Sequence, residues 1–230
     1  MDYMQWKRLG DILLSLLGMI ILAPLLLLLT IAIKLDSRGP VLFKQKRVGM
    51  KKKHFYILKF RTMRIDTPQN IPTHQLENPD QWITPMGRFL RKTSLDELPQ
   101  LWNIFVGHMS LVGPRPALWN QFDLIAERDE YGANDVPQGL TGWAQINGRD
   151  EPPIHVKARL DGEYAANLGL LMDIKCVLGT IACVLHSKGY SEGVRGVVTN
   201  LQEGAHLREE RLRGHNVTER RSEERDRDVS

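Results

Sequence analysis

Cysteine is scarce in this 230-residue sequence, which contains only Cys176 and Cys183. Two cysteines are too few for a disulfide scaffold or a cysteine-rich zinc site. Walker, GxGxxG and HExxH motifs and internal repeats are also missing, so none of the chemistries that those motifs support is indicated. The overall composition, 42% hydrophobic and 25% charged, is close to the globular average. It excludes a chain that is disordered throughout or crosses a membrane many times.

The sequence does contain one long apolar run. Ile12–Ile33 comprises 22 consecutive residues without a charge. As a straight helix it would be about 33 Å long, close to the hydrocarbon thickness of a bilayer. The run is too long for the apolar region of a signal peptide, and Lys34-Leu-Asp36 is not a small-residue cleavage site. A membrane helix is therefore the better interpretation.

Two features of this run favour a re-entrant helix hairpin over a single spanning helix. Pro24 lies in its middle, where it removes one backbone hydrogen bond and presses on the carbonyl of Ile20. Both flanks are basic, with Lys7 and Arg8 before the run, and the positive-inside rule disfavours export of either end. We predict that residues 1–38 form a re-entrant membrane helix bent at Pro24; a spanning helix is the alternative.

A strongly basic segment follows the apolar run. Residues 34–64 contain eleven Lys and Arg against Asp36 alone, a net charge of +10, so the rest of the chain carries −6. Basic residues beside a membrane anchor suit an anionic cytoplasmic leaflet and anionic substrates. No nucleic-acid-binding motif accompanies them, so we expect no nucleic-acid partner. Lys59 and Arg61 of this segment are candidate phosphate ligands.

The remaining sequence predicts a mostly helical α+β fold with a small β hairpin, as a cytosolic catalytic domain over residues 39–202. The hairpin is expected at Val41–Lys46 and His54–Thr62. A loop is expected at Gly139–Trp143. Helices are expected at Met86–Lys92, Pro99–Val106, Gln121–Tyr131, Pro153–Asn167 and Leu168–Leu185. Residues 203–230, with seven Arg and eight Asp or Glu, are predicted to be a disordered tail.

Asp96 and Glu97 form the most reactive pattern in the chain. Adjacent carboxylates can hold Mg²⁺, and a carboxylate can attack phosphorus to form a covalent intermediate. Nearby cations, among them Arg91, would bind phosphate and stabilise the transition state. The structural alternative is a helix capping box, Ser94-Leu-Asp-Glu97, in which Glu97 binds a backbone amide. Pro99 weakens this alternative without removing it, because it would lie inside such a helix.

Two other stretches carry candidate binding residues. Arg115 lies between two prolines in Gly113-Pro-Arg-Pro116, a rigid turn that would present its guanidinium for bidentate phosphate binding. A surface turn with an incidental arginine is the alternative. Gln145, Asn147 and Arg149 are candidates for nucleotide or sugar contacts, and a plain loop is the alternative for them.

Several collinear blocks make the sequence similar to a known family. The chain resembles the bacterial sugar transferases that are monotopic phosphoglycosyl transferases, small single-module enzymes acting on polyprenol phosphate. The matching blocks span most of the chain outside the tail: Lys7–Asp11, Gly39–Gly49, Tyr56–Met63, Phe89–Asn103, Met109–Pro116 and Thr141–Arg149.

The resemblance implies a function at the cytoplasmic face of the bacterial inner membrane. Asp96 would attack the β-phosphate of a nucleoside-diphosphate sugar and release UMP from a UDP-sugar. Polyprenol phosphate would then take up the sugar phosphate. Glu97 would help to bind Mg²⁺ and would position or deprotonate the second nucleophile, while Arg91 and Arg115 would hold phosphate. A homodimer and the identity of the sugar are left open.

The chain departs from the family pattern at three places. Ala23 precedes the bend proline where serine is common, His108 replaces a usual aspartate, and Val136-Pro-Gln-Gly139 lacks a usual basic residue. None of these departures touches Asp96, Glu97 or Arg115, so an active enzyme is expected. The competing functions are a non-catalytic membrane-anchored adaptor and a glycosyltransferase releasing UDP.

Overall fold

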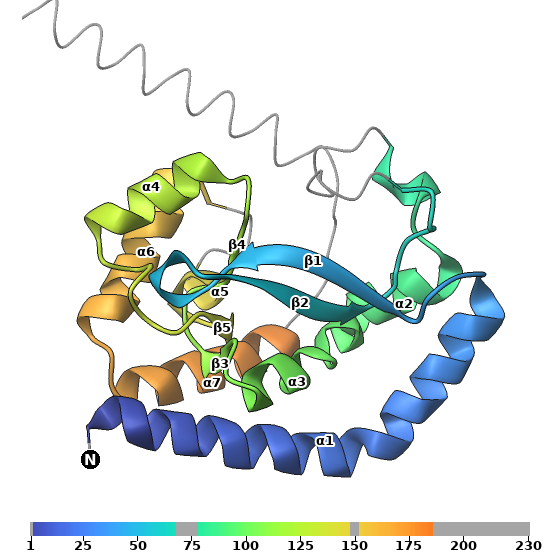
Figure 1. Ribbon diagram of the computed structural model, residues 1–230, viewed down its shortest axis with the longest axis horizontal. Coiled ribbons are helices and arrows are strands. Elements are labelled where there is room, and N and C mark those ends of the chain that lie inside the picture. Colours follow the sequence, from blue (N-terminus) through green and yellow to red (C-terminus); the bar gives the residue numbers. More distant parts are fainter. Residues whose placement is uncertain (1, 68–77, 148–151, 186–230) are drawn as a thin grey trace, which may run out of the picture. The chain divides into compact units, whose positions relative to one another are not determined.

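The N-terminal apolar run forms one long helix in the computed structural model, which describes residues 2–67, 78–147 and 152–185. Helix α1 spans Tyr3–Asp36, contains Pro24, and changes direction along its length (Figure 1). The missing amide hydrogen and the ring of Pro24 account for a bend without ending the helix. In the part of the chain that is described, α1 is the one helix long and apolar enough to cross a membrane.

The predicted hairpin is confirmed as part of a three-stranded antiparallel sheet. Strands β1 (Leu42–Val48) and β2 (His54–Phe60) pair with Leu42 opposite Phe60 and Val48 opposite His54. A short third strand, β4 (Ala117–Leu118), pairs with the end of β1, so the strand order is β2-β1-β4. The 3₁₀ turn at Met50–Lys52 closes the hairpin.

The outer edge of β2 is covered by a side chain of α3 (Gln100–Phe105). The Asn103 side chain accepts a hydrogen bond from the amide of Leu58 at 2.9 Å and donates one to the carbonyl of Tyr56 at 2.8 Å. With these two hydrogen bonds the side-chain amide of Asn103, which is 2% exposed, takes the place of a neighbouring strand at this part of the edge. The contact fixes α3 against the sheet.

A second, parallel strand pair corrects the loop expected at Gly139–Trp143. Strand β3 (Ser110–Val112) pairs with β5 (Gly139–Thr141), and α5 (Trp143–Asn147) follows directly. The strand was missed because its three residues, which begin with glycine, show no alternation of apolar and polar side chains. The strand forms only by pairing with the distant β3. A Cβ on Gly113 would lie 2.1 Å from the carbonyl oxygen of Pro137, so this pair of segments needs glycine.

Apart from α5, the helices after α1 occupy the places expected from the sequence within a few residues. In Figure 1, α1, α3 and α7 lie below the β1–β2 hairpin and α4 lies above it. Helix α4 packs on α6, while α5 contacts both α6 and α7. The remaining elements are η3 (Pro79–Gln81), α2 (Pro85–Thr93), η4 (Leu95–Glu97), α4 (Phe122–Glu130), α6 (Ile154–Ala166) and α7 (Leu170–Leu185). This is a helix-rich α+β fold.

Helix α1 is attached to the rest of the protein by apolar packing and by polar contacts. In its second half, Leu29 and Ile33 pack with Phe60 and the fully buried Leu90. In its first half, Lys7 forms a 2.5 Å ion pair with Asp173 of α7. The carboxylate of Asp11 accepts a hydrogen bond from the amide of Leu111 at 2.9 Å. Large apolar side chains on the other faces of α1 are exposed, for example Ile20 and Leu28.

Candidate active site

The adjacent carboxylates Asp96 and Glu97 lie on a short 3₁₀ turn between two helices. Helix α2 ends at Thr93, and Ser94 adopts a left-handed conformation with φ of 56°, which turns the chain into η4. The Ser94 side chain makes no capping hydrogen bond, and the carboxylate of Glu97 binds two basic side chains. The capping-box alternative is therefore wrong, and both carboxylates are available for a functional role.

Glu97 is held by two cations from different parts of the chain. Its Oε1 accepts a hydrogen bond from Lys59 Nζ of β2 at 2.7 Å and a short one from Arg115. A second Arg115 nitrogen donates to Oε2 at 3.2 Å, so the guanidinium binds the carboxylate with both prongs. Burial alone would raise the pKa of Glu97, but the charges of Arg115 and Lys59 outweigh it and lower the pKa well below its usual range. Glu97 is therefore a fixed anion.

Asp96 has a different environment from its neighbour. It is 9% exposed, and Lys59 Nζ lies 3.8 Å from its Oδ2, beyond hydrogen-bonding distance. Burial raises the pKa of Asp96, while the charges of Lys59, Arg91 and Arg115 oppose the rise. The two carboxylates thus have pKa values displaced in opposite directions, a pattern typical of groups with separate catalytic roles. Burial also lowers the pKa of Lys59, against the pull of Glu97.

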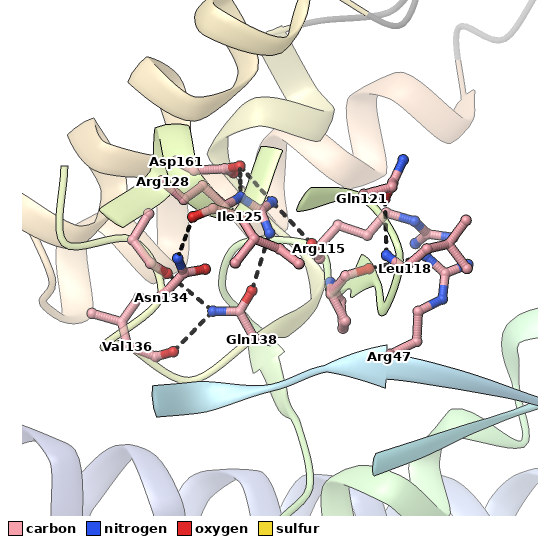
Figure 2. A network of polar contacts seen from close by, with 12 residues as sticks. Arg47, Arg115, Leu118, Gln121, Ile125, Arg128, Asn134, Val136, Gln138 and Asp161 are labelled. Carbon is pink, nitrogen blue, oxygen red and sulfur yellow. Dashed lines mark hydrogen bonds and ion pairs between the residues drawn. The ribbon is translucent and has the colours of Figure 1, made fainter. Parts of the chain in front are cut away.

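Arg115 is presented by a turn whose backbone is bonded on both sides. Pro114 and Pro116 are fully buried, which fixes the turn beside the site. Arg47 of β1 donates to the carbonyl of Pro116 at 3.0 Å, and Arg128 of α4 donates to the carbonyl of Arg115 at 2.9 Å (Figure 2). Burial and the charge of Arg115 lower the pKa of Arg47 to about 9. Arg115 is therefore part of a built site and not an incidental surface residue.

Of the other basic residues predicted for the site, Arg91 lies near the carboxylate pair and Arg61 does not. Arg91 donates from Nε to the hydroxyl of Thr62 at 3.0 Å, and its charge reaches Asp96. Arg61 lies elsewhere, and its terminal nitrogens donate at 2.7 Å to the carbonyls of Ser37 and Arg38, between α1 and β1. These hydrogen bonds hold the chain in place directly after the end of α1.

The polar stretch after β5 is helical where it was expected to be irregular. Gln145 lies in α5, and neither polar atom of its buried amide has a hydrogen-bond partner among the described residues. Asn147 is exposed and donates to the carbonyl of Trp143 at 2.9 Å. Arg149 lies outside the described residues.

Two residues that were not predicted from the sequence form a buried ion pair next to the Arg115 turn. Arg128 and Asp161, on α4 and α6, are both almost completely buried and form an ion pair. The signal was available, because Arg128 follows the buried Leu124 by four residues and so lies on the inward face of α4. A charged residue on the apolar face of a helix indicates a buried partner.

The donor set at Asp96 and Glu97 is compatible with Mg²⁺. Mg²⁺ prefers oxygen ligands, and it is often held by one or two carboxylates together with substrate phosphates. Among the described residues no cluster of three or more His, Cys, Asp or Glu could hold a metal ion by itself. The substrate phosphates would have to complete the coordination, and the cations on Glu97 would have to share its oxygens.

Comparison with known proteins identifies the family. The Bacterial sugar transferase model matches residues 2–187. The chain belongs to the bacterial sugar transferase family. A relative from Komagataeibacter xylinus named undecaprenyl-phosphate glucose phosphotransferase is 41% identical over 194 residues, covering 79% of this chain and 36% of the relative. An Escherichia coli (strain K12) relative named UDP-glucose:undecaprenyl-phosphate glucose-1-phosphate transferase is 38% identical over 188 residues, covering 76% and 39%.

The sugar transferase relatives differ in length. The chain spans little more than a third of the length of these two proteins. It is also 39% identical over 199 residues to exopolysaccharide production protein PSS of Rhizobium leguminosarum bv. phaseoli, covering 80% of this chain and 98% of that one. The matched region contains the carboxylate pair and the basic residues around it, because the family model extends over all of them.

Proposed function

We propose that this chain transfers a sugar-1-phosphate from a nucleoside-diphosphate sugar, in the first instance a UDP-sugar, to polyprenol phosphate. The observation that carries the proposal is the carboxylate pair, in which Glu97 is fixed by two cations while Asp96 is not hydrogen-bonded to Lys59. A nucleophilic carboxylate beside phosphate-binding cations suits phosphoryl transfer. The names of two relatives, undecaprenyl-phosphate glucose phosphotransferase and UDP-glucose:undecaprenyl-phosphate glucose-1-phosphate transferase, support the same reaction class.

The reaction would proceed in two displacements at one phosphorus. A carboxylate oxygen of Asp96 bonds to the β-phosphorus of the donor as the bond to the α-phosphate bridging oxygen breaks, and UMP leaves with that oxygen. A phosphate oxygen of polyprenol phosphate then attacks the same phosphorus and releases Asp96 as a carboxylate. The product is a polyprenol-diphosphate sugar. The ionised form of Asp96 is required, so its raised pKa limits the rate at low pH.

The neighbouring groups would bind and orient rather than transfer protons. With its pKa lowered by Arg115 and Lys59, Glu97 is a weak base, so it positions those two cations. Arg91, Arg115 and Lys59 would bind the donor phosphates, with Gln145, Asn147 and Arg149 as contacts to the nucleotide or sugar. Mg²⁺ held by Asp96 and Glu97 would supply charge neutralisation at the phosphates.

We further propose that α1 enters and leaves the cytoplasmic leaflet on the same side. Its bend at Pro24, its exposed apolar side chains and the basic segment after it support this arrangement. Helix α7 adds exposed Leu171 and Leu178 and would rest at the membrane interface. The enzyme would then meet polyprenol phosphate at the lipid surface.

Nucleotide release tests the reaction. Purified protein is incubated with polyprenol phosphate, Mg²⁺ and a panel of UDP-sugars, and the released nucleotide is identified. UMP is expected. UDP would indicate a glycosyltransferase, and no release from any donor would leave the adaptor function.

A matched pair of variants tests the nucleophile. Asp96→Asn should abolish both turnover and any sugar-phosphate adduct on the protein, because an amide does not attack phosphorus as a carboxylate does. Asp123→Asn, an exposed position of α4, should keep full activity. An active Asp96→Asn enzyme would contradict the assignment of the nucleophile.

Cysteine labelling tests the path of α1. Single cysteines at the exposed positions Gln5 and Arg38 are introduced after Cys176 and Cys183 have been replaced by alanine. In intact cells both should resist a membrane-impermeant thiol reagent, and in inverted vesicles both should react. Reaction of one site from each side would mean that the helix spans the membrane.

A further inference from the structure

Arg128 forms the centre of a buried polar network directly behind Arg115. It is completely buried, and its Nε and one terminal nitrogen donate to Asp161 Oδ2 at 2.8 and 2.5 Å. The same terminal nitrogen donates to the backbone carbonyl of Arg115 at 2.9 Å. Figure 2 shows the guanidinium between Asp161 and the Arg115 turn, with Gln138 on another side. One side chain therefore joins α4, α6 and the turn.

The Gln138 amide completes this arrangement. Its oxygen lies 3.5 Å from the other terminal nitrogen of Arg128, and its nitrogen donates at 3.0 Å to the carbonyls of Ala133 and Val136. Gln138 directly precedes β5, which pairs with β3, and β3 leads into the Arg115 turn. The network thus connects to the turn through the strand pair as well as through the direct hydrogen bond.

A buried ion pair of this kind is a poor source of stability. The desolvation of two charges costs about as much as their attraction returns, and an apolar pair of similar size often stabilises a fold as well or better. Burial raises the pKa of Asp161 even though Arg128 opposes the rise. Asp161 Oδ1 is also buried with no hydrogen-bond partner among the described residues. The feature that distinguishes Arg128 from an apolar residue is its ability to direct a hydrogen bond to the Arg115 carbonyl.

The position of that carbonyl matters because Arg115 binds Glu97 with two nitrogens. Arg115 binds Glu97 from a turn in which both of its neighbours are prolines, so its reach to Glu97 depends on where its backbone lies. On the far side, Arg47 bonds the next carbonyl, that of Pro116. Successive carbonyls of the turn are therefore bonded by two different arginines, the half-buried Arg47 and the fully buried Arg128.

We propose that Arg128, oriented by Asp161, is a positioning residue that fixes the Arg115 turn so that the Arg115 guanidinium meets Glu97 and the donor phosphate. The consequence for catalysis rests on the proposed function, whereas the consequence for Glu97 does not. Arg128 touches no substrate in this scheme and acts through the backbone of Arg115.

The test replaces the ion pair without leaving a lone buried charge. The double variant Arg128→Met/Asp161→Leu keeps the volume apolar and should fold, as monitored by circular dichroism and thermal unfolding. The matched control is Asp129→Asn, on the same helix as Arg128, which weakens the exposed ion pair between Asp129 and Lys52. Both are compared with the wild-type chain in detergent.

Two readouts separate the inference from the proposed function. The pKa of Glu97, followed by NMR of chains carrying ¹³C-labelled glutamate, should rise in the double variant because Arg115 is less firmly held. It should be unchanged in the control. For UMP release, kcat should fall about 10- to 100-fold, the effect expected of a misplacement of about 1 Å, with little change in KM.

Each result has one meaning. A folded double variant with an unchanged Glu97 pKa would overturn the positioning role, whatever the activity. A raised Glu97 pKa in a protein whose wild type releases no nucleotide would support the positioning role and refute the proposed function. If the double variant does not fold, the single variant Arg128→Lys, which keeps the charge but not the planar fork, gives the same Glu97 readout.

Discussion

Removal of the Lys59 charge should move the acid limb of the pH–activity profile to higher pH. Lys59 Nζ lies 3.8 Å from Asp96 Oδ2, and its charge lowers a pKa that burial raises. With an effective dielectric constant of about 20 to 80, two unit charges at this separation interact by about 1 to 4 kcal/mol, equal to about 1 to 3 pKa units. Because Asp96 must be ionised to attack, Lys59→Met should lose activity first at the acidic end.

The assay is UMP release between pH 5 and 9 at one saturating Mg²⁺ concentration, analysed as kcat/KM. Lys59→Arg, which keeps a cation beside Asp96 and Glu97, is the matched control and should retain a nearly normal acid limb. In Lys59→Met the acid limb should move to higher pH by about 1 to 3 pH units. An unshifted limb in Lys59→Met would refute the electrostatic coupling, even if the maximal rate falls because Lys59 also binds phosphate.

Three further predictions concern stability. Leu90→Ala, at a fully buried position, should lower the free energy of unfolding by about 2 to 5 kcal/mol in urea titrations, while Leu171→Ala, at a 77% exposed position, should change it by less than about 0.5 kcal/mol. Equal effects of the two would contradict the assigned core. Gly113→Ala places a Cβ 2.1 Å from the carbonyl oxygen of Pro137. It should lower the free energy of unfolding by about 1 to 3 kcal/mol and should also abolish UMP release. Gly10→Ala, whose Cβ would have no atom within 4 Å beyond its chain neighbours and its own helix backbone, should raise the thermal midpoint because alanine favours helix by about 1 kcal/mol.

Much of the fold could be predicted from local sequence patterns. The hairpin at β1 and β2 and the helices α2, α3, α4, α6 and α7 follow from periodicity and from proline and glycine punctuation, which act within a few residues. Strand β5 could not be predicted in this way, because its three residues gain their conformation from pairing with β3. The pattern did predict a helix bent at Pro24, and the packing of Leu29 and Ile33 helps to keep its second half in place.

The sequence indicated Asp96, Glu97 and Arg115, which the structure brings together, but it did not indicate the buried pair Arg128 and Asp161 behind them. Asp96, Glu97 and Arg115 were found because charge pairs and proline-flanked arginines are visible in a short window. Arg128 and Asp161 are 33 residues apart, and their pairing exists only when α4 packs on α6. Arg61 carried the same charge signal as Lys59, but its side chain bonds the chain after α1. A charge pattern alone does not distinguish these roles.

The Asn103 side chain that covers β2 has a consequence for behaviour in the cell. An exposed strand edge offers free amides and carbonyls to which a second copy of the chain could add a strand. Such an edge would favour association between copies of the chain. By occupying the amide of Leu58 and the carbonyl of Tyr56, Asn103 removes the central bonding positions of that edge. A single amide side chain therefore protects this edge of the sheet against edge-to-edge aggregation.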